Sequence, residues 1–375
     1  MNTYHEDCSG IRPAGDSPKT EASWNRAMTR NDSLLPVLPD ISRDNSFNAI
    51  RFFLCIVVIV MHCWGLSGVY RGYARFFDGH TAVRGFFVLS GFWVTRSYLL
   101  GKGMREYAAK RARRLLPMYW LTVVGAAVVL SFFSSLPARE YFSDAGFFKY
   151  LAWNGVFLNF MHHTLPGVFE GCQAGGAVNG ALWTIKVEVG FYIVLPMLVA
   201  LLKRFSSPTG RNLLLGVIYV FSVGWSFVLG HYAGQVHWLR HLNGQLPGYM
   251  SCFVCGMAYV LNWNWLKRME KWLIVPAVAL LALHYVTKTS FLLPAALTVV
   301  VFFVGTRFRF LSRIGQPVDY SYCMYLFHFP LVQLFTQLGF FRLGPKTTCL
   351  GLLAMLLGLA FVAEKYVQPL FSSRH

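Results

Sequence analysis

Apolar runs follow one another along most of this chain of 375 residues, and only short polar gaps separate them. A helix needs roughly 20 predominantly apolar residues to cross a bilayer. The composition agrees, because 55% of the residues are hydrophobic and only 13% are charged, whereas a soluble chain has about 25% charged residues. The chain is therefore predicted to be an all-α polytopic membrane protein with about ten transmembrane helices. The expected spans are residues 47–67, 82–100, 115–134, 184–202, 212–230, 246–262, 271–286, 290–305, 320–338 and 347–368.

The remaining segments complete the expected domain organisation. Residues 1–46 are polar and lack the apolar core of a signal peptide, so we expect a disordered cytoplasmic tail there. One membrane domain should extend over residues 47–370, and residues 371–375 should form a short cytoplasmic tail. Within the long gap at 135–183, residues 147–161 are apolar enough to be interfacial or re-entrant. A full span at that point would place the later basic loops outside, so we expect a segment that dips without crossing.

The formal net charge of +18 comes from 34 Lys and Arg against 16 Asp and Glu. In a soluble protein this excess would suggest nucleic-acid binding. Here the basic residues concentrate in the gaps at 101–114, 203–211, 263–270 and 306–319. These gaps all lie on the cytoplasmic side if the N-terminus does, as the positive-inside rule favours. We therefore expect both termini in the cytoplasm and no nucleic-acid partner.

Arg51 and His62 stand in the first expected span, with mostly apolar residues between them. Eleven steps of about 1.5 Å place His62 roughly 16 Å from Arg51 along the helix axis. If Arg51 lies at the cytoplasmic interface, His62 lies beyond the middle of the bilayer. An ionisable group at that depth is a candidate functional residue. The alternative is a neutral histidine that is hydrogen-bonded to a neighbouring helix.

The fourth expected span begins next to Trp183 and carries Glu188 and Tyr192. Glu188 would lie roughly 7 Å below the outer face, at a depth similar to that of His62. A carboxylate beside an imidazole can set its tautomer and raise its basicity, which a general base for a hydroxyl proton requires. The alternative is that Glu188 pairs with Lys186 or with an arginine of a loop near the interface.

Arg111 and Arg114 are three residues apart on the cytoplasmic side of the third expected span and share one helical face. Paired guanidiniums suit the phosphates of a nucleotide-like ligand such as coenzyme A. Anchoring by the positive-inside rule explains the same charges, and the two residues alone do not choose between these interpretations.

Three further residues are individually weak signals. Ser90 and Gly91, in the second expected span, would permit close approach of another helix. His328 adds a second imidazole in the ninth span. The eight cysteines show no metal-site spacing, since Cys252 and Cys255 lie inside an apolar run without further ligands, and no metal is expected.

Together these segments resemble the integral-membrane acyltransferase family 3, a bacterial group of O-acyltransferases that modify lipopolysaccharide O-antigens and exported polysaccharides. The matching segments are the first span from Arg51 to His62, FFVLSGF at 86–92, RARRLLPMYW at 111–120, NGALWTIKVEVGFY at 179–192 and SYCMYLFHFP at 321–330. Each alone is an ordinary apolar string, but five in the family's order over nearly the whole membrane domain are specific. The departure is mild: Thr184 and Ile185 stand where the family more often has Ser and Leu.

The resemblance implies a role for each of these residues. His62 matches the family's essential histidine, and Glu188 matches the acidic residue expected to assist it in catalysis. Arg51 matches the basic residue that precedes the histidine, while Arg111 and Arg114 match the pair implicated in the acyl-CoA site. Supporting roles in substrate binding or structure are expected for Ser90, Gly91, Trp183, Tyr192 and His328.

The resemblance also implies the reaction, in a bacterial inner membrane. Acetyl-CoA, or another acyl-CoA, would bind from the cytoplasm and acylate a hydroxyl of a cell-surface, exported or lipid-linked carbohydrate. His62 would either deprotonate that hydroxyl or briefly carry the acyl group, and both routes stay open. The protein's partners would be these two substrates and membrane lipid, with acceptor choice in residues 135–183, which include His162, His163, Glu170 and Gln173. The competing interpretation is a transporter or flippase of a lipid-linked sugar, which would not require CoA.

Overall fold

The computed structural model describes residues 41, 45–69, 78–233, 236, 239, 242–314 and 318–371. The chain separates into two units, Met1–Val37 and Leu38–His375. The first unit lies wholly outside the described residues. The predictions for the two terminal tails therefore fall almost entirely outside the part of the chain that the structure describes.

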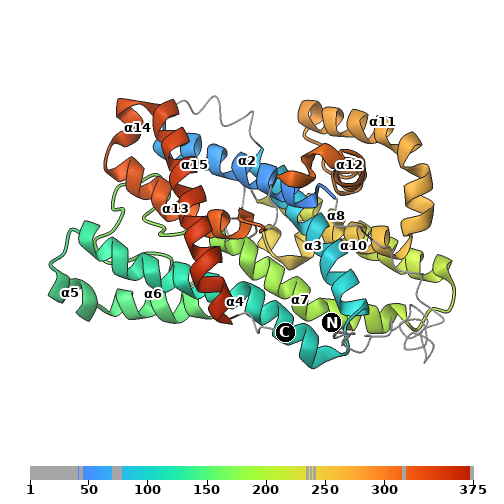
Figure 1. The fold of residues 1–375 in the computed structure, drawn as a ribbon, viewed down its shortest axis with the longest axis horizontal. Helices are drawn as coiled ribbons and strands as arrows, with labels where there is room; N and C mark the ends of the chain where they lie inside the picture. The colour runs from blue at the N-terminus through green and yellow to red at the C-terminus, as the bar shows by residue number, and fades with distance from the viewer. Residues whose placement is uncertain are drawn as a thin grey trace, which may run out of the picture. The chain divides into compact units, whose positions relative to one another are not determined.

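The regular structure of the described residues is helical, without a strand (Figure 1). A helix lies at every position where the sequence predicted a span. The elements are α2 (Phe47–Ser67), α3 (Gly79–Leu99), α4 (Met104–Val129), η2 (Leu130–Phe133), α5 (Ala138–Ser143), α6 (Ala145–Gly155), η3 (Gly180–Leu182), α7 (Trp183–Leu202), α8 (Pro208–Tyr232), α10 (Leu246–Leu261), α11 (Trp263–Thr287), α12 (Leu293–Arg307), η4 (Arg309–Arg313), α13 (Ser321–Gln337), α14 (Phe340–Leu343), α15 (Pro345–Val362), η5 (Ala363–Val367) and α16 (Gln368–Phe371).

Several of these helices have the length and apolar character of membrane spans. Within the described ranges, six are long and apolar enough to cross a bilayer: Phe47–Ser67, Met104–Phe133, Gly180–Leu202, Pro208–Tyr232, Trp263–Thr287 and Pro345–Phe371. Large apolar side chains on α8 and α11 are exposed rather than packed, as Leu213, Val220, Trp272 and Val275 show. Exposed apolar faces of this kind suit lipid and not water. The protein is therefore a multi-pass membrane protein.

The predicted dipping segment contains a short helix. Helix α6 has 11 residues and is about 16 Å long, roughly half the thickness of the hydrocarbon core. It packs on α4, where the hydroxyl of Tyr119 donates a hydrogen bond of 2.7 Å to the carbonyl of Asn154. Helix α6 is therefore too short to cross the membrane.

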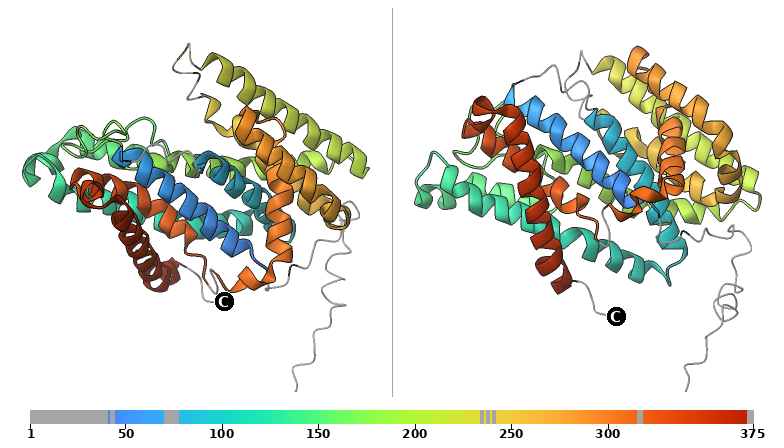
Figure 2. Two further views of the ribbon diagram at one scale, coloured as in Figure 1. Left: turned by 90° about the horizontal axis from the view of Figure 1, so that it is seen from above. Right: turned by 45° about the horizontal axis from the view of Figure 1, so that its top comes forward.

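Helix α2 packs against α3 on one side and α13 on the other, as the two views of Figure 2 show. Helix α3 also makes an unusually close contact with α10. A Cβ atom added to Gly91 would lie 2.1 Å from the carbonyl oxygen of Phe253, and one added to Gly256 would lie 2.2 Å from that of Val88. The close helix approach predicted for Gly91 is thus confirmed, and it holds α3 in place between α2 and α10.

Candidate active site

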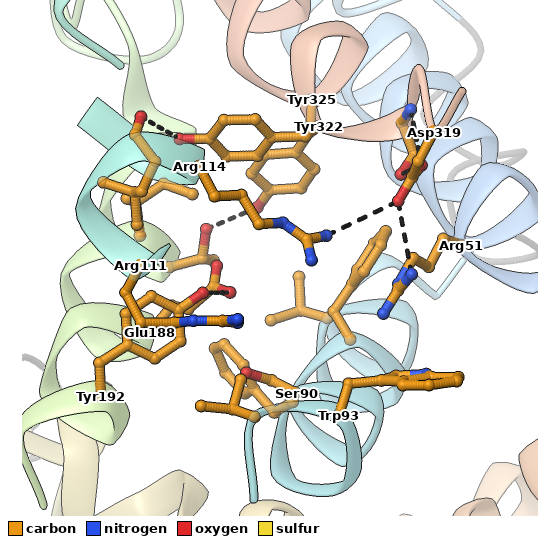
Figure 3. A pocket seen from close by; sticks show the side chains of 18 residues that line it. Arg51, Ser90, Trp93, Arg111, Arg114, Glu188, Tyr192, Asp319, Tyr322 and Tyr325 are labelled. Carbon is orange, nitrogen blue, oxygen red and sulfur yellow. Dashed lines mark hydrogen bonds and ion pairs between the residues drawn. The ribbon is translucent and has the colours of Figure 1, made fainter. Parts of the chain in front are cut away.

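A cavity of about 90 Å³ lies between α2, α3, α4, α7 and α13 (Figure 3). Three of its lining residues are arginines: Arg51 comes from α2, and Arg111 and Arg114 come from α4. Two lining residues are carboxylates, Glu188 from α7 and Asp319 immediately before α13. We call this space the arginine cavity. With all five groups ionised, one positive charge is left over, so the cavity favours an anion.

Asp319 connects two of the arginines. Its carboxylate lies 3.5 Å from Arg51 and 3.8 Å from Arg114. The backbone N–H of Ser321 donates a hydrogen bond of 3.1 Å to Asp319, which fixes this carboxylate at the start of α13. Asp319 thereby orients arginines from two different helices toward the same space. Asp319 was not among the predicted site residues, although it is a lone carboxylate in a basic gap just before an apolar run.

Arg111 and Glu188 face the cavity from the opposite wall (Figure 3). The hydroxyl of Tyr192 donates a short hydrogen bond to Glu188. The guanidinium of Arg111 lies over the ring of Tyr192, 5.7 Å from its centroid, and donates a hydrogen bond of 3.1 Å to Ser97. Glu188 is thus held by its own helix and leaves the arginines able to bind a ligand.

Three buried polar atoms in this cavity have no hydrogen-bond partner among the described residues. They are the Oγ of Ser90, the Nε1 of Trp93 and the Nε of Arg111. Unpartnered buried donors are rare in folded proteins, because each costs roughly 1–3 kcal/mol. Their presence beside three guanidiniums indicates a site for a polar, anionic ligand. This arrangement fits the phosphate-bearing donor expected at Arg51, Arg111 and Arg114.

The second polar centre is a pair of histidines on α2 and α13. The Nε2 atom of His328 lies 2.9 Å from the Nδ1 atom of His62, and Nδ1 of His328 lies 2.6 Å from the carbonyl oxygen of Tyr325. His328 is fully buried, whereas His62 keeps partial exposure. His62 is thus the member of the pair that a substrate can reach.

The hydrogen bonds assign the protons of this pair. A carbonyl oxygen can only accept, so Nδ1 of His328 carries a hydrogen. In neutral His328 the Nε2 atom is then the acceptor, and Nδ1 of His62 must be the donor. This leaves Nε2 of neutral His62 unprotonated, with a lone pair available for a proton. The arrangement gives His62 the form that a general base requires.

The structure differs from the prediction that Glu188 orients His62. Among the described residues, Glu188 contacts Tyr192 and not His62. His328 occupies the place beside His62 that was expected for Glu188. The reason is depth. Gly180, just before α7, packs on Phe329, whose ring contacts His62 at 5.1 Å between centroids. Helix α7 thus begins at the level of His62, and Glu188 lies several residues further along, about 8 Å closer to the arginines.

Tyr325 connects the two polar centres. Its side chain lines the arginine cavity, and its hydroxyl accepts a hydrogen bond of 2.9 Å from Thr184. Its backbone carbonyl holds His328, and its ring lies 5.4 Å from that of His328. The histidine pair therefore lies directly behind one wall of the arginine cavity.

The remaining predicted residues lie at different places. Trp183 packs on Tyr249 with 5.4 Å between ring centroids, away from the lining of the arginine cavity. In the gap at 135–183, the carbonyls of His162 and His163 accept hydrogen bonds from Asn154 and Val178 and so hold the loop together. Those bonds involve the backbone of the two histidines, and the part of this gap in acceptor choice stays a prediction.

Comparison with known proteins identifies the family. A family model described as an acyltransferase domain matches residues 44–363. The chain belongs to this acyltransferase family. This acyltransferase is 25% identical over 307 residues to a protein of Shigella phage Sf6 named "O-acetyl transferase", covering 78% of this chain and 86% of that protein. It is also 25% identical over 169 residues to "Nodulation protein 10" of Rhizobium leguminosarum bv. viciae, covering 43% of this chain and 46% of that protein. No solved structure matches it.

Proposed function

We propose that this acyltransferase moves an acyl group, in the first instance acetyl, from acyl-CoA to a hydroxyl of a carbohydrate. The observation that carries the proposal is the chain of contacts from Nδ1 of His62 through His328 to the carbonyl of Tyr325, directly behind the arginine cavity. This chain leaves Nε2 of neutral His62 able to accept a proton. An activated base next to an anion site is the arrangement that acyl transfer from a phosphate-bearing thioester requires. The name of the phage relative, an O-acetyl transferase, supports a hydroxyl acceptor and an acetyl group.

The donor would occupy the arginine cavity. Its phosphates would bind Arg111 and Arg114, whose guanidiniums can form paired hydrogen bonds to phosphate oxygens. A cavity of about 90 Å³ has room for a slender chain but not for an adenine nucleotide. The nucleotide would therefore stay near the mouth, and the pantetheine arm would extend toward Tyr325 and His62, over a distance of roughly 16 Å along α2.

The reaction requires one proton to move twice. In direct transfer, Nε2 of His62 takes the proton of the acceptor hydroxyl while the oxygen attacks the thioester carbonyl. The carbon–sulfur bond then breaks, and the departing thiolate takes the proton from His62. In the other route Nε2 of His62 attacks the thioester carbonyl, and the carbon–sulfur bond breaks to release the thiolate. The acceptor hydroxyl then attacks the acyl carbon, the carbon–nitrogen bond breaks, and the hydroxyl proton passes to Nε2 and on to the thiolate. The geometry of the pair is compatible with both.

We further propose that the ten predicted spans cross a bacterial inner membrane with both termini in the cytoplasm. Basic residues gather just before and at the start of α4, and at the end of α12 with η4: Lys102, Arg105, Lys110, Arg307, Arg309 and Arg313. In this topology these ends lie on the same side as Arg51, which agrees with the positive-inside rule. The donor cavity then opens toward the compartment that contains acyl-CoA.

The proposed function is tested by label transfer. Membranes that carry the full-length protein are incubated with acetyl-CoA labelled in the acetyl group, and label is counted in the surface-polysaccharide fraction. We expect transfer by the wild type and by the control His5→Ala, which changes a histidine of the polar tail, but not by His62→Ala at equal protein level. Transfer by His62→Ala at the wild-type rate would overturn the proposal. Absence of label with the wild type would favour a transporter that moves a sugar without CoA.

A further inference from the structure

A second and larger cavity, of about 700 Å³, lies among the ends of α3, α7, α8, α10 and the segment between α11 and α12. It shares none of its lining residues with the arginine cavity. We call it the α8 cavity, because α8 contributes Ser226, Phe227 and His231 to its wall. A hollow of this size is large enough for a ligand of several rings.

Positive charge gathers on the wall of the α8 cavity. Arg84, Lys186 and Lys288 line it together with the imidazoles of His80 and His231, and no carboxylate belongs to its described lining. The described part of the chain places no carboxylate within ion-pair distance of Arg84, Lys186 or Lys288. Such a concentration of unpaired cations attracts an anionic group.

Asp78 is the acidic group beside this cluster, and its carboxylate is already engaged. It accepts hydrogen bonds of 3.0 Å and 2.6 Å from the backbone and the hydroxyl of Thr81 at the start of α3. Partial burial alone would raise the pKa of Asp78, but these bonds, together with His80 and Arg84, hold that pKa below its usual value. Asp78 therefore reduces the positive field near Arg84 without occupying the cavity.

Aromatic rings provide the rest of the wall. Trp183 and Tyr249 lie side by side, with ring centroids 5.4 Å apart and planes inclined by 36°. Phe227 and Phe291 form a second pair at 5.1 Å. The C–H faces of sugar rings pack on flat aromatic surfaces, while the polar side chains of Ser226 and Asn243 can hydrogen-bond sugar hydroxyls. Aromatic rings, hydroxyl partners and cations together match an anionic sugar better than a simple ion.

The α8 cavity lies near the histidine pair. His80 lines the cavity, and its neighbour Gly79 packs on Met61, which directly precedes His62. On the other side, Trp183 lines the cavity next to Thr184, which donates a hydrogen bond to Tyr325. The α8 cavity thus lies near the histidine pair on the side of Gly79 and His80, and the arginine cavity lies near it on the side of Tyr325.

We propose that the α8 cavity binds a saccharide that carries an anionic group, either a phosphate or a carboxylate. The cations Arg84 and Lys186 hold the anionic group, and Trp183 and Tyr249 hold a sugar ring. The assignment of this saccharide as the acyl acceptor rests on the proposed function. Binding itself does not, and it can be measured without acyl transfer.

The test is saturation-transfer difference NMR on the full-length protein in phosphatidylcholine nanodiscs, which detects weak binding of small ligands. The probes are N-acetylglucosamine 1-phosphate, glucuronic acid, N-acetylglucosamine and, by competition, inorganic phosphate. We expect the two anionic sugars to bind at least tenfold more tightly than the neutral sugar, and whichever binds more tightly identifies the anionic group as phosphate or carboxylate. Arg84→Gln with Lys186→Gln should remove this preference, since tenfold in affinity is the scale of one charged contact.

Controls separate loss of the site from loss of the fold. Lys149→Gln changes an exposed lysine of α6 outside the cavity and should bind as the wild type does, and both variants should elute from a sizing column like the wild type. Equal binding of neutral and anionic sugars would overturn the proposal, as would competition by inorganic phosphate alone at the sugar phosphate's affinity. Loss of sugar binding in nanodiscs that contain phosphatidylglycerol would assign the site to a lipid headgroup and also overturn it.

The label-transfer experiment, taken together with the binding measurement, distinguishes failure of this proposal from failure of the proposed function. If the anionic sugars bind but no acetyl group is transferred from acetyl-CoA, the α8 cavity stands as a saccharide site and the acyltransferase proposal fails. If acetyl transfer occurs but the anionic sugars do not bind preferentially, the proposal for the α8 cavity fails alone.

Discussion

The arginine cavity and the α8 cavity use the same two helices for different kinds of recognition. Helices α3 and α7 contribute residues to both linings. In the arginine cavity, Asp319 holds Arg51 and Arg114 around a narrow space of about 90 Å³, and Glu188 is a second carboxylate in the wall. In the α8 cavity, the cations have no lining carboxylate and surround about 700 Å³. A narrow site with oriented guanidiniums suits one donor common to many reactions, whereas a wide cationic and aromatic site suits a bulky acceptor.

The largest expected effect is on the KM for acetyl-CoA and concerns the arginines of the arginine cavity. Arg111→Ala combined with Arg114→Ala should raise the KM for acetyl-CoA by at least about 100-fold, because two charge-assisted hydrogen bonds of roughly 1.5–3 kcal/mol each are lost. Arg113→Ala, in the same turn of α4 but outside the arginine cavity, is the matched control and should leave the KM nearly unchanged. Steady-state kinetics at varied acetyl-CoA measure this. An unchanged KM in the double variant would remove the donor from the arginine cavity.

Replacement of His328 should lower kcat, because His328 positions His62, and should leave substrate binding nearly unchanged. His328→Ala removes the acceptor of the His62 Nδ1–H, so kcat should fall by about 100-fold, the scale of general base catalysis, while both KM values stay within a few-fold. His328→Gln supplies an amide oxygen near the position of Nε2 and should recover part of kcat. A loss that is equal in both variants, or that resides in KM, would contradict a positioning role. Thermal denaturation of each variant checks that the buried substitution leaves the protein folded.

The contact of α3 with α10 should affect stability and both cavities together. Gly91→Ala places a methyl group 2.1 Å from a backbone oxygen, and we expect a loss of about 1–3 kcal/mol in the free energy of unfolding. Gly125→Ala is the control, because an added Cβ there meets nothing within 4 Å. Thermal denaturation of the purified protein measures the difference. Equal midpoints for the two variants would contradict the proposed close packing.

The smallest expected effect lies in the α8 cavity. Trp183→Leu should weaken binding of N-acetylglucosamine 1-phosphate by about three- to tenfold, the scale of one aromatic contact, whereas Trp183→Phe should keep most of it. The KM for acetyl-CoA should not change in either variant. A larger effect on acetyl-CoA than on the sugar phosphate would reverse the roles given to the two cavities.

Much of the fold followed from the order of apolar runs. The first span was predicted at 47–67, and α2 is Phe47–Ser67. Helices α4 and α11 begin several residues before their apolar runs, at Met104 and Trp263. The first two turns of each helix carry basic residues that fit a helix end at an interface, which hydropathy alone does not register.

The side-chain partners were harder to predict. His62 and His328 are 266 residues apart, and their contact depends on the rotation and depth of two helices, which periodicity does not determine. The depth of Glu188 was misjudged because α7 begins at the level of His62 and carries Glu188 about 8 Å further toward the arginines. The grouping of Arg51 with Arg111 and Arg114 followed from the family resemblance, while Asp319, which holds two of them, was not anticipated.

The most direct test of the account is the proton position on His62. The full-length protein is labelled with ¹⁵N-histidine, and the His62 signals are assigned as those absent from His62→Gln. We predict that two-bond ¹H–¹⁵N correlations at neutral pH show Nδ1 protonated and Nε2 unprotonated. A proton on Nε2 would contradict the account, because that nitrogen could not then accept the proton of an acceptor hydroxyl.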